Sequence, residues 1–147
     1  MLIRPYRETD FSALCQIFLS AVRETACQHY SASQIAAWAQ IDETRWRQKM
    51  ADSLVLVATV DLRPVGFITA AGTYIDLLFV DPAYSRQGIA SALLRELFLQ
   101  TPAGTLTVEA SLTAKACFER QGFRVVAKQE VEARGERFVN YRMEKVR

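Results

Sequence analysis

The chain has 147 residues, half of them hydrophobic, so it is long enough for one domain with a substantial core and short for two. Eighteen Lys and Arg against sixteen Asp and Glu give a net charge of +2, which excludes the strong basic footprint of a nucleic-acid or membrane-surface binder. Three cysteines without a CxxC pair argue against a disulfide framework or a cysteine-rich zinc site, and no apolar run is long enough for an export signal or a membrane span. We therefore expect one cytoplasmic domain over residues 1–147 that binds no metal, nucleic acid or membrane.

The first third of the sequence predicts one strand followed by helices. Asp10 is expected to cap the first helix, and Ser31 with Gln34 has the form of a capping box that starts a second. The expected elements are a strand over Leu2–Pro5, a helix with its apolar face from Phe11 to Val22, a helix carrying Ile35 and Trp38, and a helical segment with Trp46 and Met50 that runs to Asp52.

From Ser53 onward the apolar pattern changes to that of strands. Because a strand, helix and strand unit closes right-handed and parallel, Leu106–Ala110 is expected beside Tyr74–Val80. The chain is therefore predicted to be α+β with a mixed sheet. The expected elements are strands at Ser53–Val60 and Val65–Thr73 joined by a turn over Asp61–Pro64, a strand at Tyr74–Val80, a helix after Gly88 that buries Ala90, Leu93, Leu94, Leu97 and Phe98, a strand at Leu106–Ala110, a helix over Thr113–Gln121, and a closing hairpin of Phe123–Glu132 and Arg137–Lys145.

The turn between Val80 and the helix after Gly88 has the features of an anion site. A helix N-terminus presents unpaired backbone N–H groups and a partial positive charge, and Arg86 adds a cation. Gly88 leaves the backbone accessible, and Ala90 is small enough for the helix to lie close to the sheet. A glycine in a strand, turn and helix unit is also common for structural reasons alone, so this fragment leaves both interpretations open.

The wider order of motifs resembles the GCN5-related N-acetyltransferase (GNAT) family over nearly the whole chain. The segments that carry the resemblance are LLFVDP, SRQGIA and AKACFERQGF. The resemblance implies a GNAT-like sheet of six to seven strands, mostly antiparallel with one central parallel pair, and helices on both faces. It also implies acetyl-CoA as the acyl donor, bound at Leu78, Phe79, Val80, Ser85, Arg86, Gln87, Gly88, Ile89, Ala90, Ser91, Ser111 and Phe118.

Three of these positions depart from the family pattern. Ser85 stands in place of Gln or Arg, Ser111 in place of Asn, and Phe118 in place of Tyr. Because phenylalanine cannot donate a proton, the tyrosine acid of many relatives is absent at Phe118. A thiol of pKa about 8.5 is nevertheless a tolerable leaving group near neutral pH, and water, Tyr84 or Tyr30 are other possible proton donors.

Three residues are candidates for the base that deprotonates the acceptor amine. Asp76 is a carboxylate inside an apolar strand, where partial burial would raise its pKa, and it can equally be a hydrogen-bonded structural residue. Glu109 is a second candidate on the adjacent strand, although an exposed strand carboxylate would look the same. His29 is the only histidine and its residue type suits a base, while its position is typical of a surface residue.

The resemblance places the connection after the first helix over the acceptor site. Gln28, His29, Tyr30 and Ser31 are therefore candidate acceptor contacts. Trp38 and Trp46 are expected in the core, and Cys117 as a packed residue rather than a nucleophile.

The sequence thus predicts an acetyl-CoA-dependent N-acetyltransferase that transfers the acetyl group directly to a primary amine. The acceptor is a small-molecule amine or a protein amine, and the closing hairpin is a candidate dimer contact. A non-catalytic acyl-CoA-binding or regulatory domain stays open as an alternative because of Phe118, and a nucleotide-phosphate binder is a weaker one.

Overall fold

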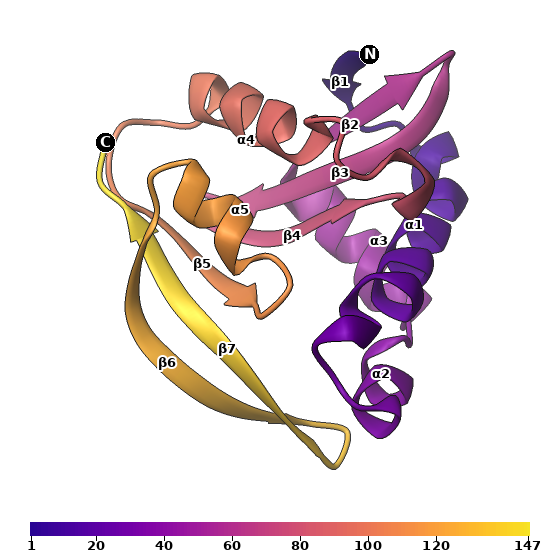
Figure 1. Cartoon of the computed structure of the whole chain (residues 1–147). Helices are drawn as coiled ribbons and strands as arrows, with labels where there is room; N and C mark the ends of the chain where they lie inside the picture. Colours follow the sequence, from indigo (N-terminus) through magenta and orange to yellow (C-terminus); the bar gives the residue numbers. More distant parts are fainter.

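The computed structural model describes all 147 residues and contains one seven-stranded mixed sheet with the strand order β1-β2-β3-β4-β5-β7-β6 (Figure 1). All neighbouring strands are antiparallel except β4 and β5, which confirms the predicted fold class. The strands are β1 (Leu2–Pro5), β2 (Leu54–Val60), β3 (Arg63–Ala71), β4 (Tyr74–Val80), β5 (Leu106–Ser111), β6 (Arg124–Ala133) and β7 (Glu136–Lys145). The helices are α1 (Phe11–Glu24), α2 (Ala32–Trp38), α3 (Glu43–Asp52), α4 (Ile89–Gln100) and α5 (Lys115–Arg120).

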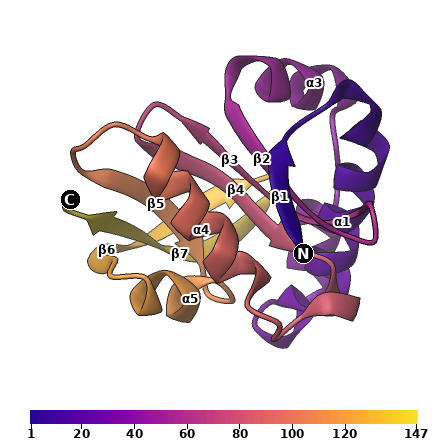
Figure 2. The same cartoon turned by 90° about the horizontal axis from the view of Figure 1, so that it is seen from above.

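Helices cover both faces of the sheet and divide the core in two. Figures 1 and 2 show α4 and α5 on one face and α1 and α3 on the other. The larger cluster of buried side chains joins α4 and α5 to the sheet, and a smaller one joins α1 and α3 to β2, β3 and β4. No helix is both long and apolar enough to cross a membrane.

The helix α4 reaches the sheet through Ile89 rather than through Ala90. Ile89 is 3% exposed, whereas Ala90 is only partly buried and faces a cavity. Opposite Ile89 lies Gly66, where a Cβ atom would be 3.0 Å from Ile89 Cγ2 and 3.2 Å from the Phe79 carbonyl oxygen. The close approach of helix and sheet that we attributed to a small residue at 90 therefore depends on Gly66.

Two of the predicted hairpin turns are tighter than expected. Between β2 and β3 only Asp61 and Leu62 form the turn, and both take left-handed backbone angles. Arg134 and Gly135 do the same between β6 and β7. Two successive residues with left-handed angles form the two-residue turn that matches the twist of a β-hairpin. The turn of Asp61 and Leu62 contains no glycine that would have indicated it.

The strand β4 contains a bulge at Asp76. Thr69 of β3 pairs with Leu77 and Ala70 pairs with Ile75, so Asp76 has no residue opposite it. The Leu77 N–H donates instead to Thr69 Oγ1 at 3.1 Å. A bulge changes the direction of the extra side chain and increases the local twist. The bulge therefore falls at the one charged residue of the apolar run YIDLLFV.

Asp10 is the N-cap residue of α1, as the sequence predicted, but its side chain makes no capping hydrogen bond to the helix. Its carboxylate instead accepts two hydrogen bonds from the Arg4 guanidinium, each 2.8 Å, and one from the Arg7 N–H, also 2.8 Å. Asp10 is 5% exposed. The hydrogen bond from Arg4, strengthened by the Arg7 N–H and the Arg4 charge, holds the pKa of this carboxyl below its usual range despite burial.

We expect this ion pair to stabilise the fold at neutral pH and not in acid. A carboxyl whose pKa is lower in the folded chain contributes stability above its unfolded pKa of about 3.9 and loses it as the pH falls through the folded pKa. Urea unfolding should therefore show a difference between wild type and Asp10→Asn that is large near neutral pH and shrinks in acid. The exposed Asp52→Asn substitution is the control, and a difference independent of pH would contradict the assignment.

Candidate functional site

Two cavities share lining residues and meet where β4 and β5 separate. The α4 cavity has a volume of about 650 Å³ and is bordered by the turn before α4 and by α5. The aromatic cavity has a volume of about 450 Å³ and lies among α2, α3, β4, β5 and β7. The residues that line both are Trp38, Leu78, Phe79, Ser111 and Ala114. The parallel pairing of β4 and β5 is recorded only at Tyr74 and Ile75, and beyond it the strands leave room for this junction.

The α4 cavity collects most of the residues predicted to bind acetyl-CoA. Gln87 lines neither cavity, and Phe118 lines the aromatic cavity instead. The predicted cofactor residues in the α4 cavity are Leu78, Phe79, Val80, Ser85, Arg86, Gly88, Ile89, Ala90, Ser91 and Ser111.

The turn before α4 has a backbone that exposes N–H groups. Arg86 and Gly88 both take left-handed angles, with φ of 60° and 77°. Gly88 is the N-cap residue and offers no side-chain cap, while the first helical bond runs from the Ala92 N–H to the Gly88 carbonyl. The N–H groups of the three residues between them have no intrahelical acceptor and point beyond the helix end. A Cβ atom on Gly88 would touch nothing, so the glycine is required by its backbone angle.

The edge of β4 that faces β5 is free along most of its length. The Asp81 N–H donates to the Val65 carbonyl, so the backbone of Asp81 faces β3, and by strand alternation that of Phe79 does too. Leu78 and Val80 therefore direct their N–H and C=O groups toward the gap beside β5. A free strand edge of this kind is the usual partner of an extended ligand.

Aromatic rings form one end of the aromatic cavity. Phe79 is in contact with Phe18 at a centroid distance of 4.9 Å and with Trp38 at 6.3 Å. Trp46 packs against Phe18 at 4.8 Å, and Phe138 lies 6.4 Å from Trp38. Trp38 and Trp46 do pack against the smaller core cluster, as expected, but they also line this cavity.

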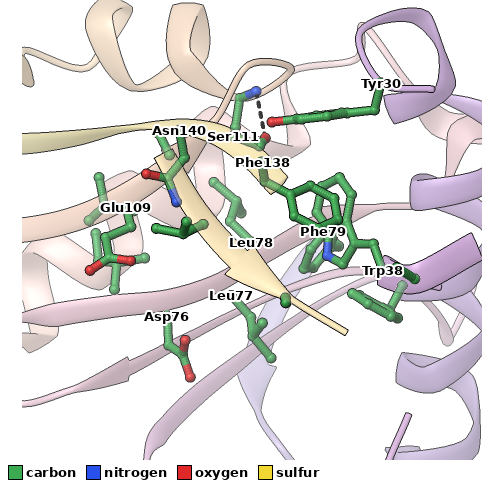
Figure 3. A pocket seen from close by; sticks show the side chains of 18 of the residues that line it. Tyr30, Trp38, Asp76, Leu77, Leu78, Phe79, Glu109, Ser111, Phe138 and Asn140 are labelled. Atoms are coloured by element: carbon green, nitrogen blue, oxygen red, sulfur yellow. Dashed lines mark hydrogen bonds between the residues drawn. The ribbon is translucent and has the colours of Figure 1, made fainter. Parts of the chain in front are cut away.

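Carboxylates lie at the other end, away from the rings of Trp38, Phe79 and Phe138 (Figure 3). Asp76 is partly buried and its Oδ2 lies 2.5 Å from Lys49 Nζ on α3. Glu109 lies on β5, is exposed, and has no ion-pair partner within 4.0 Å.

Tyr74 lines the same cavity, and the charges of both carboxylates act on its phenol. Burial, followed by the charges of Glu109 and Asp76, raises the pKa of Tyr74 to about 12. Its phenol is therefore neutral at physiological pH and is available as an O–H donor. Tyr74 adds no charge to this end of the cavity.

The residues of the connection after α1 divide between the cavities. Tyr30 lines the aromatic cavity, where its hydroxyl donates to the Val139 carbonyl at 3.0 Å and accepts from the Leu112 N–H at 2.9 Å. Burial raises the pKa of Tyr30. Gln28 lines the α4 cavity.

The two remaining candidates from this connection lie outside both cavities. His29 is exposed and its Nδ1 is 3.1 Å from Thr113 Oγ1. Ser31 caps α2, with its Oγ accepting from the Gln34 N–H at 3.2 Å, which confirms the predicted capping box.

Sequence reasoning missed many residues of the aromatic cavity, among them Tyr74, Phe138 and Asn140. The last two lie two residues apart on β7 and share a face of the sheet. Because side chains alternate along a strand, the sequence could have placed Phe138 and Asn140 on one face, with Val139 on the other. Nothing in the sequence indicated that this face of the closing hairpin would line a cavity together with residues of α2, α3 and β4.

Comparisons with known proteins agree with this geometry. A family profile described as "Acetyltransferase (GNAT) domain" matches residues 26–145. The chain is 55% identical over 141 residues to "Uncharacterized N-acetyltransferase YafP" of Escherichia coli K12, covering 96% of this chain and 93% of that protein. It is 34% identical over 73 residues to "Peptidyl-lysine N-acetyltransferase YjaB" of Salmonella typhimurium, about half of each chain. A crystal structure of a GCN5-related N-acetyltransferase from Rhodopseudomonas palustris superposes with a TM-score of 0.95 at 30% identity, covering 99% of this chain and 95% of that one.

Proposed function

The chain belongs to the GCN5-related N-acetyltransferase (GNAT) family, and from that premise we propose that it moves an acetyl group from acetyl-CoA directly to a primary amine. Residues 1–147 act as one domain, with the donor in the α4 cavity and the acceptor in the aromatic cavity. The observation that carries the proposal is that these two cavities share lining residues and meet where β4 and β5 separate.

The α4 cavity has the chemistry that acetyl-CoA requires. The exposed N–H groups before Ala92 and the Arg86 side chain suit the pyrophosphate, because a helix N-terminus favours anions. The free backbone groups of Leu78 and Val80 suit the pantetheine arm, which carries amides and pairs like an added strand. When bound, acetyl-CoA supplies an acyl group activated as a thioester.

Direct transfer fits the groups found at the junction. Cys117 lines the α4 cavity, but burial raises the pKa of its thiol more than the Arg120 charge lowers it, so it is a poor nucleophile at neutral pH. In the proposed reaction the acceptor ammonium gives one proton to Glu109 or Asp76, directly or through water. The amine nitrogen then bonds to the acetyl carbon, and the bond between that carbon and the CoA sulfur breaks. The second proton from the nitrogen passes to the sulfur, so that CoA leaves as a thiol.

Replacing Gly88 with valine is expected to weaken CoA binding by about tenfold to a hundredfold, or roughly 1.4 to 2.8 kcal/mol. Valine is strained at a φ of 77° and the turn must rearrange, which withdraws the N–H groups from the anion. Gly72→Val is the matched control, because Gly72 has a φ of 61°, equally open surroundings and no place in either cavity. Calorimetry with CoA measures the effect. Equal losses of affinity in both variants would contradict the proposal that the N–H groups before Ala92 bind the pyrophosphate.

The same titrations separate the alternatives. Calorimetry of the wild type with CoA, ATP and NAD tests the donor, and a clear preference for either nucleotide over CoA would overturn the proposal. Release of free CoA from acetyl-CoA in the presence of an amine panel tests catalysis. Tight acetyl-CoA binding with no turnover on any amine would favour a non-catalytic acyl-CoA-binding domain, the alternative that Phe118 keeps open.

A further inference from the structure

We propose that the acceptor is a small primary alkylammonium that carries an aromatic ring, with the charge held near Glu109 and Asp76 and the ring held among the side chains around Phe79. This inference rests on the proposed function, since it assigns the acceptor class of the same site. Three independent features of the aromatic cavity carry it.

The first feature is aromatic surface that the protein core leaves uncovered. Trp38, Trp46, Phe79 and Phe138 are only partly buried, and all four face the cavity. Their contacts with one another are edge-on or tilted, which leaves ring faces and edges for a further ring. A cavity of about 450 Å³ is within the range of small-molecule sites.

The second feature is a carboxylate without an ion-pair partner at the opposite end. Glu109 has no ion-pair partner, and Asp76 already holds a primary ammonium, that of Lys49, at 2.5 Å. Arg134 is the only cationic residue that lines the cavity, and it is occupied in donating to the Ala37 carbonyl at 2.9 Å. A cationic amine therefore fits this end better than a neutral arylamine does.

The third feature is a cover formed by α2 and the tip of the β6–β7 hairpin. Gln34 Nε2 donates to the Arg137 carbonyl at 2.6 Å, and Arg134 donates in the reverse direction to α2. Tyr30 adds its bond to Val139. These three bonds join the two sides of the cavity, which favours a small amine over a lysine on the surface of a folded protein.

The two tryptophans of the chain both line this cavity, so intrinsic fluorescence reports binding without acetyl-CoA. We expect 2-phenylethylamine to give a saturable change. Removing the charge, as in 2-phenylethanol, should weaken binding about threefold to fivefold. Removing the ring, as in propylamine, should weaken it by more than about tenfold, because the buried ring supplies most of the apolar area.

Two variants test which residues bind the charged end of the ligand and which bind its ring. Glu109→Gln should weaken 2-phenylethylamine binding about threefold to fivefold and leave 2-phenylethanol unchanged. Phe138→Leu should weaken both about threefold to tenfold. Glu132→Gln is the matched control, because Glu132 is an exposed strand carboxylate outside both cavities. Thermal unfolding of each variant establishes that it is folded.

These outcomes distinguish the proposed acceptor class from the proposed N-acetyltransferase function. Saturable binding with the expected order supports the acceptor class even if acetyl-CoA proves not to be the donor. Failure of 2-phenylethylamine to bind, or equal binding of propylamine or aniline, would overturn the acceptor class. Acetylation of spermidine or a lysine peptide without such binding would overturn it while leaving the proposed N-acetyltransferase function intact.

Discussion

Replacing Phe118 with alanine is expected to lower the free energy of unfolding by about 3–5 kcal/mol, the usual cost of emptying a buried aromatic site. Phe118 is 2% exposed and packs edge-on against Phe123 at a centroid distance of 5.2 Å. It is also the only buried residue of α5, a helix of six residues. So short a helix is not stable alone, so its position depends on this one side chain.

Replacing Phe118 should also disturb the residues at the junction of the two cavities and so weaken CoA binding. Ala114 at the start of α5 donates its N–H to Ser111 Oγ at 3.1 Å, and both residues line both cavities. Urea unfolding measures the stability and calorimetry measures CoA binding. Leu99→Ala is the control, since it truncates a large apolar side chain that is 80% exposed and should change stability by less than about 0.5 kcal/mol. A cost below about 1 kcal/mol at Phe118 would mean that α5 is anchored elsewhere.

This burial also changes how the missing tyrosine is interpreted. Sequence comparison treated Phe118 as a catalytic position that had lost its hydroxyl. In the structure it is a core residue whose ring borders the aromatic cavity. Packing explains an aromatic side chain at this position. In the proposed reaction the leaving sulfur receives its proton through water or a hydroxyl group, such as that of Tyr84 in the α4 cavity.

Much of the fold followed from periodicity in the sequence. The helical spacing from Phe11 to Val22, the capping box at Ser31 and the apolar runs of β2 to β5 each predicted their element. The parallel β4–β5 pair followed from the handedness of a strand, helix and strand unit. Most of the α4 cavity, the proposed donor site, was predictable for the same reason, because the strand end, the turn and the helix start are contiguous in sequence.

The aromatic cavity, the proposed acceptor site, was less predictable because its residues meet only through tertiary structure. Trp38 and Trp46 have the spacing of core residues, and whether such a ring faces a core or a cavity depends on what lies opposite. The partner of Asp76 is Lys49, which lies 27 positions earlier in a different element and shows no local pattern. The bulge that directs Asp76 toward α3 depends on the pairing of β3 with β4, which a single strand does not reveal.

The bulge gives the two candidate carboxylates different roles. Asp76 faces α3 and is neutralised by Lys49, while Glu109 on the regular strand β5 has no ion-pair partner. A base must accept a proton from the acceptor. A carboxylate already bound to an ammonium is less available for this task than a free one, so we assign the base to Glu109 and the positioning of charge to Asp76.

Replacing Glu109 with glutamine is therefore expected to reduce kcat by about a hundredfold to ten-thousandfold, the usual contribution of a general base. Asp76→Asn should reduce it less and should raise KM for the amine, because it removes charge and leaves Lys49 without its partner. The measurement is CoA release with saturating acetyl-CoA and the best acceptor of the amine panel, across a range of pH. Glu132→Gln should match wild type.

The pH dependence distinguishes a lost base from a lost binding contact. If Glu109 is the base, raising the pH should partly restore the rate of Glu109→Gln, because more of the acceptor is then a neutral amine without enzymatic help. Removing the partner of Asp76 provides the reciprocal test, since Lys49→Met leaves Asp76 free to replace the missing base. We expect Lys49→Met to raise the residual activity of Glu109→Gln. If Asp76→Asn costs more than Glu109→Gln at every pH, the two assignments are reversed.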